Sequence, residues 1–288
     1  MAKGRSLHIG LNSVDPSAYG GWDGQLKACE ADANDMAAIA EGLGYETRKL
    51  LTADATSSAI LEELAQAVTD LGDGDIFLLT YSGHGGQVPD SNGDEPDRMD
   101  ETWVSYDRQI VDDELYAAFG TFATGVRIAV LSDSCHSGSV VKAVLDAVQP
   151  DALSAALDSQ DSPASLMKAM PADVCERDYQ SRKADYDRIQ QQVKAFDKTD
   201  IGASVLLISG CQDNQTSADG DRNGLFTQTL RQVWHDGKFK GSYKKFSKDI
   251  VAKMPPWQTP NYFTAGTPSP AFERQHPFAI KAGRTVLV

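Results

Sequence analysis

Two short segments of the sequence carry an imidazole and a thiol in positions where they could form a nucleophilic pair. LLTYSGHGG (78–86) places His84 directly after an apolar run, and VLSDSCHSG (130–138) places Cys135 directly after another. A free thiol is mostly protonated at neutral pH, so an imidazole that accepts its proton makes it a better nucleophile. Together the segments predict covalent cysteine catalysis. Alone, each is more typical of ordinary structure, since a cysteine at a strand end is usually an inert hydrophobic residue.

His84, and not the adjacent His136, is the better partner for Cys135. Consecutive side chains of an extended chain point to opposite sides, which directs His136 away from the thiol beside it. If the two apolar runs are neighbouring parallel strands, about 4.8 Å apart, side chains just beyond their carboxyl ends can meet. Backbone N–H groups of Gly85 and Cys135 could then stabilise the oxyanion of a tetrahedral intermediate.

The elements that would position this pair alternate between apolar strands and amphipathic helices. Strands are predicted over 6–12, 46–51, 75–83, 126–134 and 204–210. Helices are predicted over 36–43, 60–71, 112–122, 223–236 and 243–254. Buried strands that alternate with helices form a mostly parallel sheet with helices on both faces. The predicted fold class is therefore α/β, and we expect one domain over 1–288.

The acidic balance of the chain excludes some partners. The sequence has 27 Lys and Arg against 41 Asp and Glu, a formal net charge of −14, whereas nucleic-acid-binding proteins carry basic surfaces. Metal ions, or substrates bearing Arg and Lys, fit this charge better.

No stretch has the character of a signal peptide or membrane span, and the four cysteines form no CxxC pair. We expect a cytoplasmic protein with reduced thiols that binds neither nucleic acid nor membrane.

Residues 150–200 interrupt the alternation of strands and helices. The part over 150–175 is rich in Ala, Ser, Asp and Pro, and 176–198 is charged and predicts a solvated helix. A connection of about fifty residues between two core strands is usually functional or flexible. Composition alone fits a surface excursion without a role equally well.

The histidine and cysteine segments, with four others, resemble the metacaspases, whose prokaryotic relatives are sometimes called orthocaspases. YSGHGGQ (81–87) and DSCHSGS (133–139) are similar to the family's histidine and cysteine boxes. LKACEADA (26–33) resembles its early L-x-G-C-x-N-D-A motif, with alanines for the Gly and the Asn. Three further segments fit the family's order, GDEPDRMDE (93–101), IVDDEL (110–115) and SGCQDNQTSAD (209–219). The resemblance implies a caspase-like fold and a cysteine endopeptidase with a dyad of His84 and Cys135.

The position of Asp133 close to Cys135 suggests a role in substrate binding. Asp133 precedes Cys135 by two residues, so both side chains lean to the same side of a strand, and a carboxylate there should raise the pKa of the thiol. Substrate binding would explain this unfavourable placement. The resemblance implies that Asp32 and Asp133 form the floor of the pocket for the residue before the scissile bond, lined by Cys29 and Ser82. From the later loop, Asp213 is a further candidate.

Two carboxylates suit a guanidinium, which offers a fork of donors. We therefore expect protein or peptide substrates with Arg, then Lys, before the scissile bond. Taken alone, Asp32 fits the stabilisation of a helix N-terminus better than a pocket, and Asp133 fits a hydrogen-bonded acid at a strand end equally well.

The acidic segment SNGDEPDRMDE (91–101) could hold calcium, although the chemistry itself requires no cofactor. Five carboxylates within eleven residues provide the hard oxygen ligands that suit Ca²⁺. A solvated acidic loop without a metal is the simpler interpretation of this segment. The resemblance implies calcium as an activator, with the ligands Asp97, Asp100, Asp112 and Asp113. Lys142 stands where the family has another ligand, and its ammonium removes that ligand and adds repulsion. The sequence thus leaves calcium activation open.

The 150–200 insert lies where caspase relatives carry the linker between their large and small portions. It contains basic residues suited to an Arg/Lys-preferring pocket, namely Lys168, Arg177, Arg182 and Lys183. We expect autoprocessing in this segment, and the resemblance implies a monomer. Two alternatives stay open: a catalytically silent caspase-like binding scaffold, and a calcium-responsive interaction protein that uses the acids of 90–113.

Overall fold

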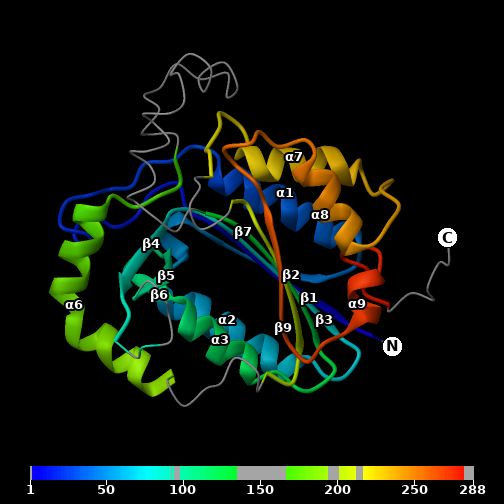
Figure 1. The fold of residues 1–288 in the computed structure, drawn as a ribbon, viewed down its shortest axis with the longest axis horizontal. Helices are drawn as coiled ribbons and strands as arrows, with labels where there is room; N and C mark the ends of the chain where they lie inside the picture. Colours follow the sequence, from blue (N-terminus) through cyan, green and yellow to red (C-terminus); the bar gives the residue numbers. More distant parts are fainter. Residues whose placement is uncertain are drawn as a thin grey trace.

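A central six-stranded sheet organises the protein (Figure 1). The computed structural model describes residues 2–91, 93, 98–134, 167–193, 201–211 and 217–281. The strands are β1 (Gly4–Gly10), β2 (Glu46–Leu51), β3 (Ile76–Ser82), β7 (Arg127–Asp133), β8 (Ser204–Ser209) and β9 (Asn261–Gly266), in the order β2-β1-β3-β7-β8-β9. All neighbours pair in parallel except β9, which is antiparallel to β8. The predicted mostly parallel α/β sheet is confirmed. β9 was not predicted, because this partly exposed edge strand lacks an apolar run.

Helices cover both faces of this sheet, as the alternating pattern predicts. On one face lie α1 (Cys29–Gly42), α7 (Leu225–Trp234), α8 (Tyr243–Val251) and the short α9 (Pro270–Arg274). On the other lie α2 (Ser57–Asp70) and α3 (Asp112–Gly120), with a single 3₁₀ turn, η1 (Thr52–Asp54), before α2. Two separate clusters of buried apolar side chains fill the layers above and below the sheet. Among the described residues, no helix is long and apolar enough to cross a membrane.

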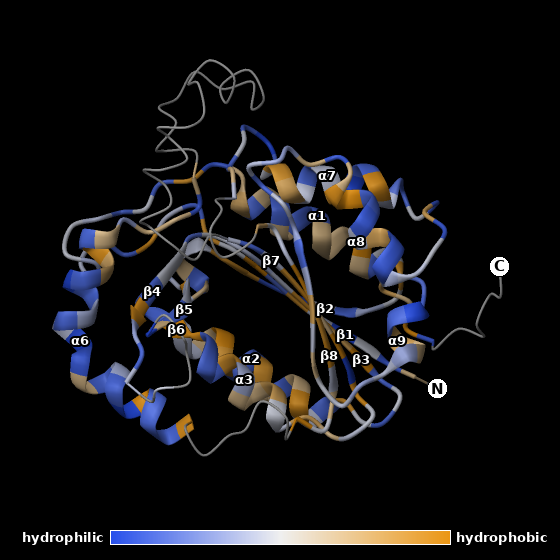
Figure 2. Cartoon of the chain, viewed as in Figure 1, coloured by the Kyte–Doolittle hydropathy of each residue, from blue (hydrophilic) through white to orange (hydrophobic). Residues whose placement is uncertain are grey.

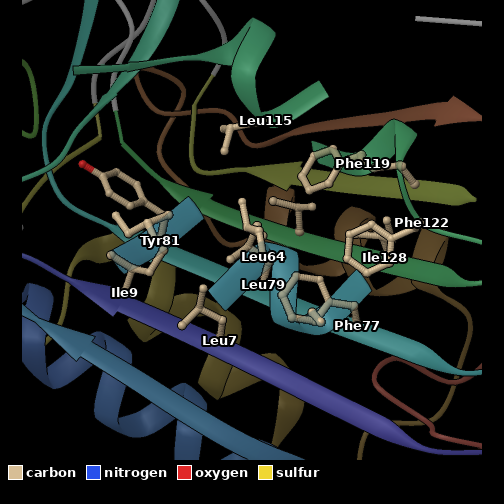
Figure 3. Close-up of a cluster of buried hydrophobic side chains, with 14 of the residues drawn as sticks. Leu7, Ile9, Leu64, Phe77, Leu79, Tyr81, Leu115, Phe119, Phe122 and Ile128 are labelled. Atoms are coloured by element: carbon tan, nitrogen blue, oxygen red, sulfur yellow. The ribbon is translucent and has the colours of Figure 1, made fainter. Parts of the chain in front are cut away.

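The middle strands β3 and β7 are buried at every position, so they read as continuous hydrophobic runs (Figure 2). Figure 3 shows the cluster on one face, with Tyr81 at its end. The hydroxyl of Tyr81 donates to the carbonyl of His84, 2.6 Å away, or to that of Val104, 3.0 Å away, and its ring stacks on Trp103 with centroids 4.4 Å apart. The core thereby fixes the chain just beyond the carboxyl end of β3.

A second, antiparallel sheet was not predicted. It consists of β4 (Gly85–Pro89), β5 (Met99–Val104) and β6 (Gln109–Val111), within a region that the sequence presents as acidic loops. Its short strands contain Gly, Pro and acids, which weaken the usual strand pattern. The consequence for function is that β4 begins immediately after His84.

The helix α6 (Ala172–Val193) packs on this small sheet. A helix in this region was predicted, but its fully solvated character was wrong. Tyr179 and Tyr186 are buried with Val88 and Val111 of the sheet, although the helix is largely hydrophilic (Figure 2). Residues 167–193 are therefore part of the packed structure and not a surface excursion. The remainder of the 150–200 insert lies outside the described residues.

The contact between α1 and β1 is unusually close and should be sensitive to added volume. A Cβ on Gly10 would overlap the carbonyl oxygen of Cys29 and lie 2.9 Å from the Cβ of Ala33. We expect Gly10→Ala to lower the free energy of unfolding by about 1–3 kcal/mol, the usual cost of overpacking. Urea unfolding measures this change. Gly72→Ala is the matched control, since a Cβ there meets nothing within 4 Å, and an equal loss in both variants would contradict the prediction.

Candidate active site

A lysine of the insert occupies the predicted acidic pocket. The ammonium of Lys168 lies 3.0 Å from Oδ2 of Asp32, 2.9 Å from Oδ2 of Asp133 and 2.9 Å from Oγ of Ser82. Lys168 is 0% exposed, and the side chains of the two acids are 2% and 3% exposed. A buried cation is stable in a protein only when it is paired and hydrogen-bonded. The pocket thus satisfies all three donors of an ammonium group.

Three elements bring these groups together. Ser82 ends β3 and Asp133 ends β7, and the two residues are register partners in the parallel ladder. Asp32 lies in the first turn of α1, which begins at Cys29, earlier than the apolar spacing predicts. The predicted pocket members Asp32, Asp133 and Ser82 therefore meet at the carboxyl edge of the sheet, where ligand sites of such sheets form.

The segment that begins α7 holds the two acids in place, and the sequence analysis missed it. Asn223 donates its side-chain amide to Oδ1 of Asp32 at 3.0 Å, and the backbone N–H of Gly224 donates to the same atom at 3.0 Å. Thr227 lies with its hydroxyl 3.2 Å from Oδ2 of Asp133. These residues stand at the start of the predicted helix over 223–236. A helix N-terminus facing an acid was the available signal.

Two further contacts, also missed, come from the loop before α7. Ser217 donates its hydroxyl to Oδ1 of Asp133. The carboxylate of Asp219 accepts the backbone N–H groups of Lys27 and Ala28, at 2.6 and 3.2 Å, and so holds the entry to α1 against this loop. The predicted pocket residue Asp213 lies outside the described residues.

Burial and charge oppose each other in the pocket. Burial raises the pKa of Asp32 to about 6, with a further rise from Asp133, although Lys168 opposes it. Burial lowers the pKa of Lys168, but Asp133 and Asp32 outweigh that effect and raise it well above its ordinary value. At neutral pH the ammonium and Asp32 are both ionised. The site is therefore built to hold a cation with two acidic side chains.

His84 is buried and uncharged. Burial, with a smaller contribution from Lys168, lowers its pKa to about 4, while the carbonyl of Gly24 opposes the shift. Nε2 lies 3.0 Å from that carbonyl oxygen, and Nδ1 has no hydrogen-bond partner among the described atoms. The ring lies against Trp22, with centroids 4.9 Å apart. Donation from Nε2–H to Gly24 leaves Nδ1 unprotonated and able to accept a proton.

The backbone around Lys168 runs as a short extended segment beside β4. The N–H of Gly85 donates to the carbonyl oxygen of Lys168 at 3.0 Å, and the N–H of Met170 donates back to Gly85 at 2.8 Å. On the other side, the N–H of Lys168 donates to the carbonyl of Ser217 at 2.9 Å. The candidate oxyanion donor Gly85 therefore already binds a peptide carbonyl, directly after the imidazole of His84.

Two predicted site residues remain, the cysteines Cys29 and Cys135. Cys29 is buried at the start of α1, and burial raises the pKa of its thiol well above its ordinary value, so it is a poor nucleophile. Cys135 lies outside the described residues. It follows Asp133 by two residues, as His84 follows Ser82.

The predicted calcium ligands are only partly described. Asp100 is buried on β5, and Asp112 and Asp113 open α3, whereas Asp97 and Lys142 lie outside the described residues. Within the described part of the chain, no three His, Cys, Asp or Glu side chains are grouped so that they could hold a metal ion. Calcium activation stays a prediction.

Removing the Lys168 ammonium should destabilise the intact protein strongly. Lys168→Met leaves two buried acids without their cation, which typically costs about 3–5 kcal/mol. We expect this loss in urea unfolding, measured in a Cys135→Ala background so that the chain stays intact. Lys183→Met is the matched control, because the Lys183 side chain is 52% exposed in a surface ion pair, and such pairs contribute little to stability. Equal stability of the two variants would contradict the assignment.

Comparisons with known proteins agree with this architecture. The caspase domain family model matches residues 13–278. Metacaspase-1 of Kluyveromyces lactis is 31% identical over 256 residues, which are 78% of this chain and 56% of the relative. Metacaspase-1 of Saccharomyces cerevisiae is 30% identical over 267 residues, 80% of this chain and 58% of the relative. The chain thus spans a little more than half the length of these curated relatives.

Solved structures extend the comparison. A crystal structure of a protein from Geobacter sulfurreducens is 52% identical, with a TM-score of 0.85, and covers 96% of this chain and 99% of that one. Caspase-1 from Spodoptera frugiperda is 11% identical, with a TM-score of 0.54 over 92% of this chain and 88% of that one, and shows a shared fold. The predicted resemblance and fold are confirmed: this chain belongs to the caspase-domain family of peptidases, as a metacaspase-like member.

Proposed function

We propose that this protein is a cysteine endopeptidase that cleaves peptide bonds after Arg or Lys. The observation that carries the proposal is the placement of Lys168, whose ammonium sits between Asp32 and Asp133 while its carbonyl oxygen accepts from Gly85. A peptide bound in this way has its basic side chain in the pocket and its carbonyl beside a donor. A guanidinium fits two acids at least as well as an ammonium.

Cys135 is the nucleophile and His84 the base in this mechanism. Nδ1 of His84 accepts the thiol proton, and the sulfur attacks the carbonyl carbon of the bound Arg or Lys residue. The N–H of Gly85 then stabilises the negative oxygen of the tetrahedral intermediate. Its collapse forms a thioester, and the imidazolium gives its proton to the departing amine. Water activated by His84 hydrolyses the thioester and restores the thiol.

The register of the sheet supports the pairing of these two residues. Ser82 and Asp133 lie opposite each other on neighbouring strands, and each precedes its catalytic residue by two positions. Side chains that follow adjacent parallel strand ends are within reach of one another. The adjacent His136 has no comparable support.

Lys168 itself is the proposed site of autoprocessing. Of the four basic residues predicted in the insert, Arg177 and Lys183 have side chains more than half exposed, and Arg182 pairs with Asp178 within α6. Lys168 alone among them is extended and seated in the acidic pocket, which makes the bond to Ala169 the expected cleavage point. Until this bond is cut and the segment leaves, Lys168 competes with substrates.

Other proposals rest on the sequence. We propose a cytoplasmic monomer that acts on proteins or peptides, and we propose calcium as an activator that takes no part in bond cleavage. The two binding-scaffold alternatives predict no Cys135-dependent turnover, so the assays below separate them from the peptidase.

A peptide-library assay tests the proposed activity. We expect cleavage after Arg and Lys and none after Asp, because an acidic residue would meet two acids in the pocket. Cys135→Ala and His84→Ala should each lower kcat/KM at least about 1,000-fold, as losses of activated nucleophiles and their bases do. Parallel assays with and without calcium test activation. Turnover that survives Cys135→Ala would contradict the mechanism, and a complete absence of turnover would favour a scaffold.

Intact-mass spectrometry tests autoprocessing. On incubation, wild-type protein should give fragments that end at Lys168 and begin at Ala169, and Cys135→Ala should stay intact. Lys168→Ala removes the side chain that the pocket holds, so cleavage there should cease, whereas Lys183→Ala should process normally. Cleavage at another residue in wild type, or unchanged cleavage in Lys168→Ala, would exclude this site.

A further inference from the structure

We propose that Gly224 determines the depth of the primary specificity pocket, so that only a residue without a side chain at this position admits a full-length basic side chain. The inference rests on the proposed function, because it assigns a residue that selects among substrates of that activity. It concerns the length of the basic side chain that the pocket admits, whereas Asp32 and Asp133 supply the negative charge.

The space beside Gly224 is the space that the cation occupies. A Cβ on Gly224 would overlap Nζ of Lys168, and would stand 2.5 Å from Oδ2 of Asp133 and 3.0 Å from Oδ2 of Asp32. Carbon and nitrogen atoms in ordinary contact are about 3.5 Å apart. The ammonium therefore occupies space that any side chain on residue 224 would fill.

The backbone does not require glycine here. Gly224 has φ −57° and ψ 150°, a region open to every L-residue. It is the residue before the first turn of α7, where Ser, Thr, Asp and Asn are at least as favourable. Its backbone N–H, which donates to Asp32, would be retained by alanine. The close approach of the cation and of Oδ2 of Asp133 is thus the reason for glycine that remains.

Substrates that differ in the length of their basic side chain test this role of Gly224. A general loss of stability would lower the cleavage of both substrates alike, whereas a change in pocket depth would not. Ornithine has one methylene fewer than lysine, so its ammonium ends roughly 1.3 Å short of the lysine position, where a methyl group on residue 224 leaves room. We compare peptides that differ only in lysine or ornithine before the scissile bond. In wild type the lysine peptide should be the better substrate, because its ammonium reaches both acids.

In Gly224→Ala, kcat/KM for the lysine peptide should fall about 100-fold, the scale of a displacement near 1 Å at a reacting group. The ornithine peptide should lose far less, so the lysine-to-ornithine ratio should fall at least about tenfold. The Gly72→Ala variant, whose added methyl meets nothing within 4 Å, is the control and should keep the wild-type ratio. Thermal unfolding of both variants shows whether the fold persists.

The outcomes separate the two proposals. If wild type cleaves no basic peptide, the proposed function fails. If wild type is active and Gly224→Ala lowers both peptides equally, or neither, the depth-setting role of Gly224 is overturned while the peptidase assignment stands. If the alanine variant does not fold, the wild-type comparison decides: equal cleavage of the lysine and ornithine peptides would overturn the role of Gly224, because the space beside it would then contribute nothing to binding.

Discussion

The contact between one buried ammonium and two buried acids organises the active region of this protein. Lys168 reaches Asp32 on α1 and Asp133 at the end of β7, and so ties the insert to the sheet and to the helix that covers it. Such a triad has a large desolvation cost, and its stability depends on every remaining polar atom finding a partner. Asn223, Gly224 and Thr227 supply those partners from the start of α7.

The same contact joins stability to function. In the proposed function, the pocket that Lys168 fills in the intact chain is the same pocket that binds the basic side chain of a substrate. The extended backbone at Lys168, held by Gly85 on one side and Ser217 on the other, gives the chain's own segment the form of a bound peptide. His84 contributes an uncharged imidazole, because burial and the nearby ammonium both disfavour its protonated form. The proposed catalysis and self-cleavage thus draw on one arrangement.

Sequence patterns predicted the parallel core well, for a physical reason. Strands that are buried on both faces consist mainly of consecutive apolar residues, and β3 and β7 have such sequences. The short strands β4–β6 and the edge strand β9 were not predicted from the sequence, because their residues are half-exposed or lie in acidic and glycine-rich segments. The predicted pocket acids meet because the ends of parallel strands coincide. The role of Lys168 as their partner depends on a long-range contact that no local pattern encodes.

Gly224 is a second residue whose proposed role could not be predicted from local sequence. In the sequence it is one glycine before a helix, a position with several ordinary explanations. Only the contact between its missing side chain and Nζ of Lys168 distinguishes it. The supporting hydrogen bonds to Asp32 come from residues about 190 positions away, and so they follow from the folded topology and not from spacing.

The central claim is that charge recognition by the two acids governs binding before the scissile bond. Its most direct measurement compares kcat/KM for peptides with arginine and with citrulline, which has nearly the same shape without the charge. The account predicts a preference for arginine of at least about 100-fold, on the scale of a buried charge-assisted contact, which collapses toward unity in Asp133→Asn. Equal cleavage of the two peptides by the wild-type protein would contradict it.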